Sequence, residues 1–215
     1  MTPRVLVIVG TPLSGSLARA TADAYISGVG ESSDVRVIDL AHDSIPAHPQ
    51  SKADLRAADG LSHLEADVQR YIADVDWAQH IVIAYPQWWG TQPAALKAFI
   101  DRVFIARHSF AYDDGLLPKR LLTGRTARVF MTMDSPRLWN RLVFRNASET
   151  SITRAVLEFC GIKVRGIHRF GPVRTSDPAG RAAWLERARK AGEKDAERLS
   201  RSVSAATPRE SVLAS

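Results

Sequence analysis

The sequence predicts an α/β fold in which five parallel strands form one doubly wound sheet with helices on both faces. Short apolar runs of strand length alternate along the chain with segments in which apolar residues recur every three or four positions. The first run, residues 5–9, has no polar alternation, which is typical of a central strand buried on both sides. With 215 residues, 45% of them hydrophobic, the chain has the size and composition of one domain.

The elements of the first half follow from this alternation. A helix is predicted over residues 16–27 and a second strand over residues 35–38. After a loop rich in Pro and His, apolar residues at steps of three and four predict a helix over residues 61–75, and residues 80–84 form the third strand. Pro93 then opens a helix whose buried face consists of Leu96, Phe99, Ile100, Val103 and Phe104.

Four further elements complete the predicted fold. Residues 127–132 form the fourth strand, and a helix over residues 152–160 ends at Gly161, a natural C-terminal cap. Residues 163–170 form the fifth strand, and residues 178–201 form the last helix. The order of elements predicts helix-connected parallel strands throughout.

We therefore expect residues 1–201 to form the domain. Residues 202–215 are rich in Ser and Ala and have little to bury, so they are predicted to be a disordered tail. Ligands of doubly wound sheets bind beyond the carboxyl ends of the strands. The loops after the first, third and fourth strands are where a binding site is expected.

Composition excludes several classes of protein. The single cysteine, Cys160, permits no internal disulfide or thiolate zinc site, and it lies on the apolar stripe of its helix, where it is expected to be buried and inert. No histidine pair has metal-ligand spacing, so no metal site is predicted. The first apolar run is too short for a signal-peptide core and no run approaches a membrane span. These observations predict a cytoplasmic protein without membrane insertion.

The charge is unevenly distributed. The net charge is +6, and basic residues outnumber acidic ones 20 to 9 after residue 118. Basic residues of the last helix are interleaved with acidic ones, as on a solvated helix face, and no recognition motif accompanies them. Nucleic-acid binding is therefore not expected, and a small anionic ligand such as a phosphorylated cofactor fits the charge better.

The loop after the first strand, residues 10–17, combines two glycines with the hydroxyls of Thr11, Ser14 and Ser16 and enters a helix directly. Such a loop cradles phosphate groups, because backbone N–H groups at a helix start point at the anion. A nucleotide P-loop would need Lys and then Ser or Thr where Ser16 and Leu17 stand, and the dinucleotide fingerprint is absent. A plain polar turn in which Ser14 or Ser16 caps the helix remains an equal alternative.

The loop after the third strand carries two adjacent tryptophans, Trp88 and Trp89, between Pro86 and Gly90. They lie outside the periodic segments, at the end of the sheet where a ligand is expected. Large rigid aromatic side chains and free backbone amides suit a planar heteroaromatic ligand. The alternative is that one tryptophan is a structural wedge.

Residues 85–104 closely resemble the corresponding segment of the flavodoxin-like NAD(P)H-quinone reductase family. The resemblance extends in matching order over about residues 4–175, and it includes residues 10–17, 107–115, 132–136 and 157–162. It implies a flavodoxin-like sheet with strand order 2-1-3-4-5.

The resemblance also implies roles for individual residues. Positions that match the family's flavin contacts are Thr11, Ser16, Leu17, Pro86, Gln87, Trp88 and Trp89. The predicted cofactor-binding set also includes Ser14, Gly90, Met133, Asp134 and Ser135 from the same loops. His108, Phe110 and Tyr112 match a segment that reaches the substrate, with the two aromatic side chains coming from the neighbouring subunit of a homodimer. Lys97, Asp101 and Arg102 are interpreted as helix-surface or dimer contacts.

The chain departs from the best-known quinone reductases after the fourth strand. Where those enzymes have a Gly-rich loop with Tyr and His near the flavin, residues 134–141 read Asp-Ser-Pro-Arg-Leu-Trp-Asn-Arg. No catalytic proton donor is therefore assigned. Arg137, Arg141 and Arg145 follow in this loop; they either bind the phosphates of the electron donor or tie the loop to acidic neighbours.

The implied function is a flavin-dependent NAD(P)H oxidoreductase that reduces quinones or similar planar acceptors by ping-pong hydride transfer, with FMN favoured over FAD. The alternative is a flavodoxin-like ancillary subunit of a transporter, whose main role is protein association. A receiver-type signalling domain is excluded, because Thr11 and Pro86 stand where that class needs aspartates.

Overall fold

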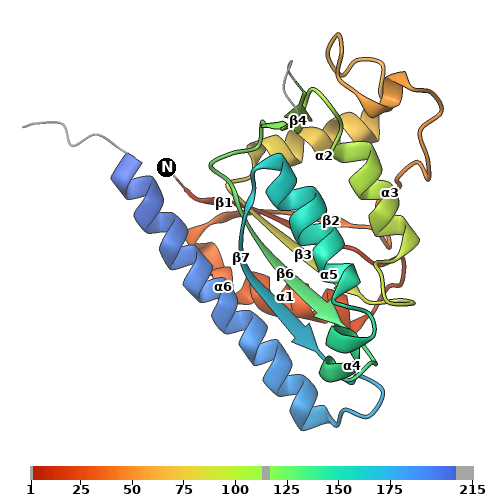
Figure 1. Ribbon diagram of the computed structural model, residues 1–215. Coiled ribbons are helices and arrows are strands. Elements are labelled where there is room, and N and C mark those ends of the chain that lie inside the picture. The colour runs from red at the N-terminus through yellow and green to blue at the C-terminus, as the bar shows by residue number, and fades with distance from the viewer. Residues whose placement is uncertain (1, 113–116, 207–215) are drawn as a thin grey trace, which may run out of the picture.

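The computed structural model of the chain describes residues 2–112 and 117–206. Five parallel strands form one sheet, with β2 and β7 at its edges (Figure 1). In spatial order the strands are β2 (Asp34–Asp39), β1 (Arg4–Val9), β3 (His80–Pro86), β6 (Thr126–Thr132) and β7 (Lys163–Phe170). Since β6 and β7 are the predicted fourth and fifth strands, the fold class and the order 2-1-3-4-5 are confirmed.

Helices cover both faces of the sheet (Figure 1). One face carries α1 (Leu17–Val29) and α6 (Pro178–Ala206). The other carries α2 (Ala66–Trp77), α3 (Ala94–Val103) and α5 (Ala147–Ile152), which continues as the π-helical segment η3 (Thr153–Glu158). Alternate residues of β1 point into two separate apolar clusters and all five of residues 5–9 are fully buried, as predicted for a central strand.

Three helix boundaries differ from the sequence prediction. The helix predicted over residues 152–160 begins at Ala147, as α5. α2 begins at Ala66 and not at residue 61, because Leu61 and the buried Leu64 form a preceding turn that supplies apolar contacts without helical geometry. α6 continues to Ala206, so residues 202–206 are helical and not a disordered tail. The rest of the predicted tail, residues 207–215, lies outside the described residues.

Short elements were missed because they are too short to show a period. The arginine-rich segment after β6 contains a helix, α4 (Arg137–Leu142), where a loop was expected. The other missed elements are a two-stranded pair and two single-turn helices. They are β4 (Phe110–Ala111) with β5 (Lys119–Arg120), η1 (Gly30–Ser32) and η2 (Ala53–Leu55).

Arg102 is not a helix-surface residue. Its side chain is fully buried and forms ion pairs with Asp54, at 3.3 Å, and with Glu65. These ion pairs therefore hold the long connection between β2 and α2 against α3. Lys97 and Asp101 do form an exposed ion pair on the helix surface, as expected.

A buried ion pair joins α6 to the sheet. Arg128 of β6 donates to both carboxylate oxygens of Asp195, which is 1% exposed, and Tyr25 of α1 donates to the same carboxylate at 3.1 Å. Burial raises the pKa of Asp195, but hydrogen bonds from Arg128 and His80 outweigh that effect and leave the pKa well below its usual range. Burial lowers the pKa of His80, which favours its neutral form beside this pair.

The two helices on this face touch backbone to backbone. A Cβ atom on Gly28 of α1 would lie 1.9 Å from the carbonyl oxygen of Arg189, and a Cβ atom on Gly192 of α6 would lie 2.2 Å from that of Tyr25. Only glycine permits this approach at either position.

No helix of the described chain is long and apolar enough to cross a bilayer.

Replacing Asp195 with asparagine should lower the free energy of unfolding by about 3–5 kcal/mol, because the charge of Arg128 would stay buried without its counter-charge. The matched control is Glu193→Gln, two residues earlier, which removes an exposed ion pair with Arg189 and should cost less than about 1 kcal/mol. Urea unfolding of the two variants and the wild type measures the difference. Equal stabilities of the two variants would contradict the assigned role of the buried pair.

Candidate functional site

The loop between β1 and α1 lies at the carboxyl edge of the sheet. Ser16 is the N-cap of α1, and its Oγ accepts the N–H of Arg19 at 3.1 Å. The buried Thr11 accepts the N–H of Leu13 at 3.3 Å, which closes the loop. Capping, one of the two alternatives, is therefore present. It does not exclude a phosphate site, because the Ser16 hydroxyl proton and the first N–H groups of α1 have no intrahelical acceptor.

The side chain of Gln87 links the loops at this edge of the sheet by hydrogen bonds. Its Nε2 donates to Oδ1 of Asn140 in α4 at 2.7 Å, and its Oε1 accepts the hydroxyl of Ser135 at 3.1 Å. Asn140 is fully buried and donates in turn to Oδ1 of Asn146 at 3.1 Å. The amide of Gln87 is thus committed to positioning the loops after β3 and β6 and the helix α4.

The two tryptophans occupy a tight turn and point differently. Trp88 and Thr91 exchange two backbone hydrogen bonds of 2.9 Å, and the residues between them, Trp89 and Gly90, both have positive φ angles of 52° and 74°. Such a pair of angles defines a type I′ turn. Trp89 is consequently fully exposed, whereas Trp88 is 38% exposed and faces the cavity.

The same turn limits which backbone donors are free. The N–H of Gln87 donates to the carbonyl of Thr132 at 2.7 Å, and that of Trp88 donates to Thr91. Within the described residues, this leaves the N–H groups of Trp89 and Gly90 as the unpaired donors of the turn. The free backbone amides expected from the sequence are therefore limited to these two.

The loop after β6 is held by β7 and by the segment beyond it. The N–H of Met133 donates to the carbonyl of Phe170 at 2.9 Å, and the carbonyl of Met133 accepts the N–H of Val173 at 3.0 Å. Asp134 accepts the N–H of Arg174 at 2.7 Å. The Met133 side chain is 2% exposed, so this position contributes mainly its backbone to the rim of the site.

These loops line a cavity of about 200 Å³ beside a wider space of about 550 Å³, and the two share Gln87, Trp88 and Asp134 as lining residues. The cavity is lined by Thr11, Leu13, Ser16, Leu17, Ala18, Pro86, Gln87, Trp88, Thr132, Met133, Asp134 and Val173. The wider space adds Trp89, Gly90, Ser135 and Phe144. The structure thus brings together eleven of the twelve predicted cofactor positions; Ser14, which is exposed, lines neither space.

The predicted substrate residues do not gather here. His108 lies 3.1 Å from Asp76, and the ring of Phe110 packs on Phe159 with centroids 5.0 Å apart and on the exposed Tyr112 at 5.9 Å. These residues follow α3 and surround β4, at the opposite end of the sheet from α4 (Figure 1). Within one protomer they cannot meet the ligand of the cavity.

Arg137 and Arg141 lie beside the site, exposed on α4. Arg137 donates to the carbonyl of Arg169 at 2.9 Å, which is not an acidic neighbour. Arg141 and Arg145 form no ion pair among the described residues. The alternative in which these arginines tie a loop to acidic side chains is not what the structure shows.

Sequence reasoning missed three residues that form the site. Asn140 positions Gln87, and Val173 lines the cavity from the segment beyond β7. Phe144 packs close to Gly90: a Cβ atom added to that glycine would lie 3.4 Å from the phenyl ring. None of the three stands in a segment whose sequence marks it as part of a site; Asn140 lies among Leu, Trp and two arginines in a helix of six residues. Tyr85, at the end of β3, is buried against Ser148, and burial raises its pKa well above the usual value.

A doubly wound sheet whose carboxyl edge joins a polar helix start to an aromatic turn defines a flavodoxin-type α/β protein. Residues 3–192 match the family model described as flavodoxin-like fold, and the chain belongs to that family.

Individual relatives are distant. The chain is 28% identical over 138 residues to the "FMN-dependent NADH:quinone oxidoreductase" of Bordetella avium, covering 60% of this chain and 68% of that protein. It is 27% identical over 122 residues to an "uncharacterized NAD(P)H oxidoreductase" of Haemophilus influenzae, covering 56% of this chain but only 59% of that protein. A solved "NAD(P)H:quinone oxidoreductase" from Methanothermobacter marburgensis shares the fold, with a TM-score of 0.73, 22% identity, and coverage of 90% and 96% of the two chains.

Replacing Asn140 with alanine should lower the free energy of unfolding by about 1–3 kcal/mol, because the half-buried amide of Gln87 would lose its acceptor and Asn140 itself is fully buried. Leu138→Ala is the control on the same helix; its side chain is exposed, so the change should stay within about 0.5 kcal/mol. Urea unfolding compares the two. An Asn140→Ala variant with the stability of the wild type would show that the hydrogen bonds of Gln87 do not hold the site together.

Proposed function

We propose that this protein is a flavin-dependent NAD(P)H oxidoreductase that reduces quinones or similar planar acceptors, with FMN as the cofactor. The observation that carries the proposal is the cavity at the carboxyl edge of the sheet, which has a helix N-terminus at one end and Trp88 at the other. The names of the Bordetella and Haemophilus relatives support the same activity. They also favour an oxidoreductase over an ancillary transporter subunit.

The residues of the cavity fit such a cofactor. The hydroxyl of Ser16 and the free N–H groups at the start of α1 supply donors for a phosphate. Asp134, the acidic residue that lines the cavity among the described residues, accepts the N–H of Arg174. Pro86, Trp88 and the backbone of Met133 and Asp134 form apolar and flat walls for a ring system. The N–H groups of Trp89 and Gly90 are free to bond to the polar edge of the ring.

A bound flavin supplies the redox chemistry, taking a hydride from a reduced nicotinamide and passing it to the acceptor. Pro86, Trp88 and the backbone of Met133 and Asp134 would hold the flavin, and the wider space beside Trp89 and Phe144 would remain for a second planar molecule. Donor and acceptor would use that space in turn, which would give a ping-pong cycle. The donors of the Trp89–Gly90 turn would stabilise negative charge on the reduced ring without a titrating side chain.

Replacing Ser16 with aspartate should weaken FMN binding by at least about tenfold to a hundredfold, because a carboxylate would face the phosphate. Aspartate is an equally good N-cap, so α1 should remain intact. The matched control, Ser14→Asp, adds the same charge to the same loop outside the cavity and should change binding far less. Quenching of FMN fluorescence on titration measures both. A wild-type protein that neither carries nor binds flavin would overturn the proposal.

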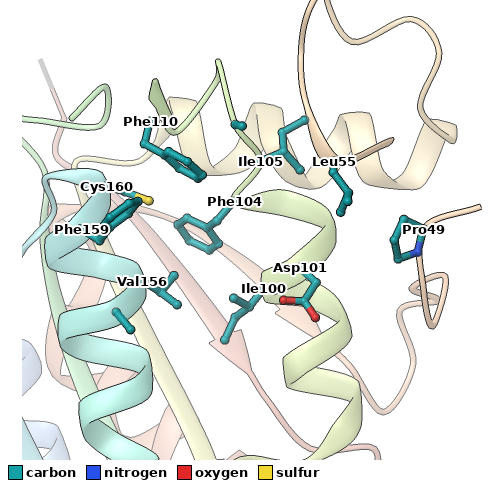
Figure 2. A pocket seen from close by; sticks show the side chains of 12 residues that line it. Pro49, Leu55, Ile100, Asp101, Phe104, Ile105, Phe110, Val156, Phe159 and Cys160 are labelled. Atoms are coloured by element: carbon teal, nitrogen blue, oxygen red, sulfur yellow. The ribbon is translucent and has the colours of Figure 1, made fainter. Parts of the chain in front are cut away.

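The activity is proposed to reside in a two-fold dimer. An apolar groove of about 410 Å³ lies between α3 and η3 (Figure 2) and shares no lining residue with the cavity. Phe104, Phe110 and Phe159 form its floor, and Leu55 and Pro49 approach from the connection after β2. Cys160 also lines it, and burial raises the pKa of its thiol to about 12, so the thiol is unreactive.

The direction of α3 explains how a dimer would complete the site. The helix begins beside the Trp88 turn and ends beside Phe110, at the opposite edge of the sheet. Two copies of α3 packed antiparallel about a two-fold axis would therefore bring the partner's Phe110 and Tyr112 to the Trp88 side of this protomer. His108 would arrive with them as a substrate-contacting residue.

Leu55→Asp should shift the protein from dimer to monomer at micromolar concentration, because it places a charge in the apolar groove. Val37→Asp is the control, since Val37 is similarly exposed but lies on the edge strand β2. Sedimentation velocity measures both. A wild-type monomer with full reductase activity would contradict the dimer proposal.

The donor is proposed to be NADPH, with its 2′-phosphate held by Arg141, because that guanidinium is exposed beside the site and has no acidic partner among the described residues. Arg137 stands one helical turn away and supports the same binding region.

Arg141→Ala should lower kcat/KM for NADPH about tenfold to a hundredfold and leave that for NADH unchanged, because one charge-assisted contact to the 2′-phosphate is lost. Arg201→Ala, exposed on the far end of α6, is the control. Steady-state kinetics with both donors at two ionic strengths measures the effect. Equal use of both donors by the wild type, unaltered by salt or by the Arg141 change, would exclude this contact.

A further inference from the structure

The outward face of α4 is apolar, which is unusual for a short surface helix. Leu138, Trp139, Leu142 and Val143 are each between 51% and 65% exposed, whereas Asn140 on the inward side is fully buried. Leu138 with Leu142, and Trp139 with Val143, are spaced four residues apart, so they form two adjacent stripes. A contiguous exposed patch of large apolar side chains marks an interaction surface.

Arginine side chains make the surroundings of this face positively charged. Residues 135–148 contain three arginines and no acidic residue. The nearest carboxylates are engaged elsewhere: Asp134 accepts the N–H of Arg174, and Glu149 is 3% exposed and ion-paired with Arg169. Arg145 has no ion-pair partner among the described residues. A surface that combines Trp and Leu with uncompensated arginines is complementary to anionic lipid headgroups over an apolar layer.

The face also borders the candidate site. Phe144, at the end of α4, packs near Gly90 and lines the wider space beside the cavity, and the fully exposed Trp89 stands on the same rim. In Figure 1, α4 lies beyond the carboxyl ends of β6 and β7, away from β4 and from the apolar groove of Figure 2. The face is therefore separate from the apolar groove, and it meets the proposed dimer only at the rim of the cavity, where the partner's Phe110 and Tyr112 would arrive.

We propose that the outward face of α4, with Trp89, docks this protein on an anionic lipid surface. Leu138, Trp139, Leu142 and Val143 enter the boundary between headgroups and acyl chains, while Arg137 and Arg145 bind lipid phosphates. The docking needs no membrane-spanning helix. Combined with the proposed function, on which this consequence rests, it presents the open side of the cavity to acceptors dissolved in the bilayer and identifies them as lipophilic.

The purified full chain is tested by co-sedimentation with two kinds of vesicle, phosphatidylcholine alone and phosphatidylcholine mixed in equal amounts with phosphatidylglycerol. Binding is expected to the mixed vesicles and to be much weaker with phosphatidylcholine alone. Arg145→Gln should weaken binding about fivefold, the effect of one charge near an anionic surface. The double variant Trp139→Ser, Leu142→Ser should weaken it at least about tenfold.

The matched control lies outside α4. Leu117→Ser alters a leucine that is even more exposed than those of α4 and should bind vesicles like the wild type. Absence of binding to the mixed vesicles, or equal binding by the Trp139→Ser, Leu142→Ser variant, overturns the proposal. Dissociation of an oligomer by that variant in sedimentation velocity shows that a second copy covers the face and also overturns it. Titration with FMN reports separately on the flavin, so failure of one proposal is distinguishable from failure of the other.

Discussion

The side-chain amide of Gln87 holds the functional edge of the molecule together. Its two hydrogen bonds fix the turn after β3 against Ser135 in the loop after β6 and against Asn140 in α4. The turn that carries Trp88, the loop at Ser135 and the helix α4 are linked through these two bonds. A neutral amide suits this role, because it donates and accepts at once and brings no charge into a place where an anionic ligand is proposed to bind.

The regular parts of the fold were predictable because burial acts on them through a simple period. Residues 5–9 lie between two helical layers, so all of them are apolar, and the buried face of α3 follows the spacing of a helix. α4 has six residues, too few to show a period. Arg102 was misread because a charged residue on a helix normally faces water; only the tertiary partners Asp54 and Glu65, distant in sequence, reveal that it is buried.

The candidate site was predictable where the chain places several chemical signals in one loop, and not where distant segments meet. The α1 loop and the Trp88 turn are recognisable by their glycines, hydroxyls and adjacent tryptophans. Val173 lines the cavity, Phe144 lines the wider space, and Asn140 positions Gln87, all from segments that carry no such signal. The assignments of His108, Phe110 and Tyr112 depend on a second subunit, which one protomer cannot supply.

The contact between α1 and α6 has a consequence for synthesis on the ribosome. The α1 backbone at Gly28 and the charge of Arg128 are both covered by the last helix of the described chain. Until Asp195 has emerged from the exit tunnel, Arg128 has no counter-charge and one face of the sheet stays open to water. The other face, built from α2, α3 and α5, needs no residue beyond Phe170. Co-translational folding should therefore complete that layer first and close the α1 layer only after Asp195 is released.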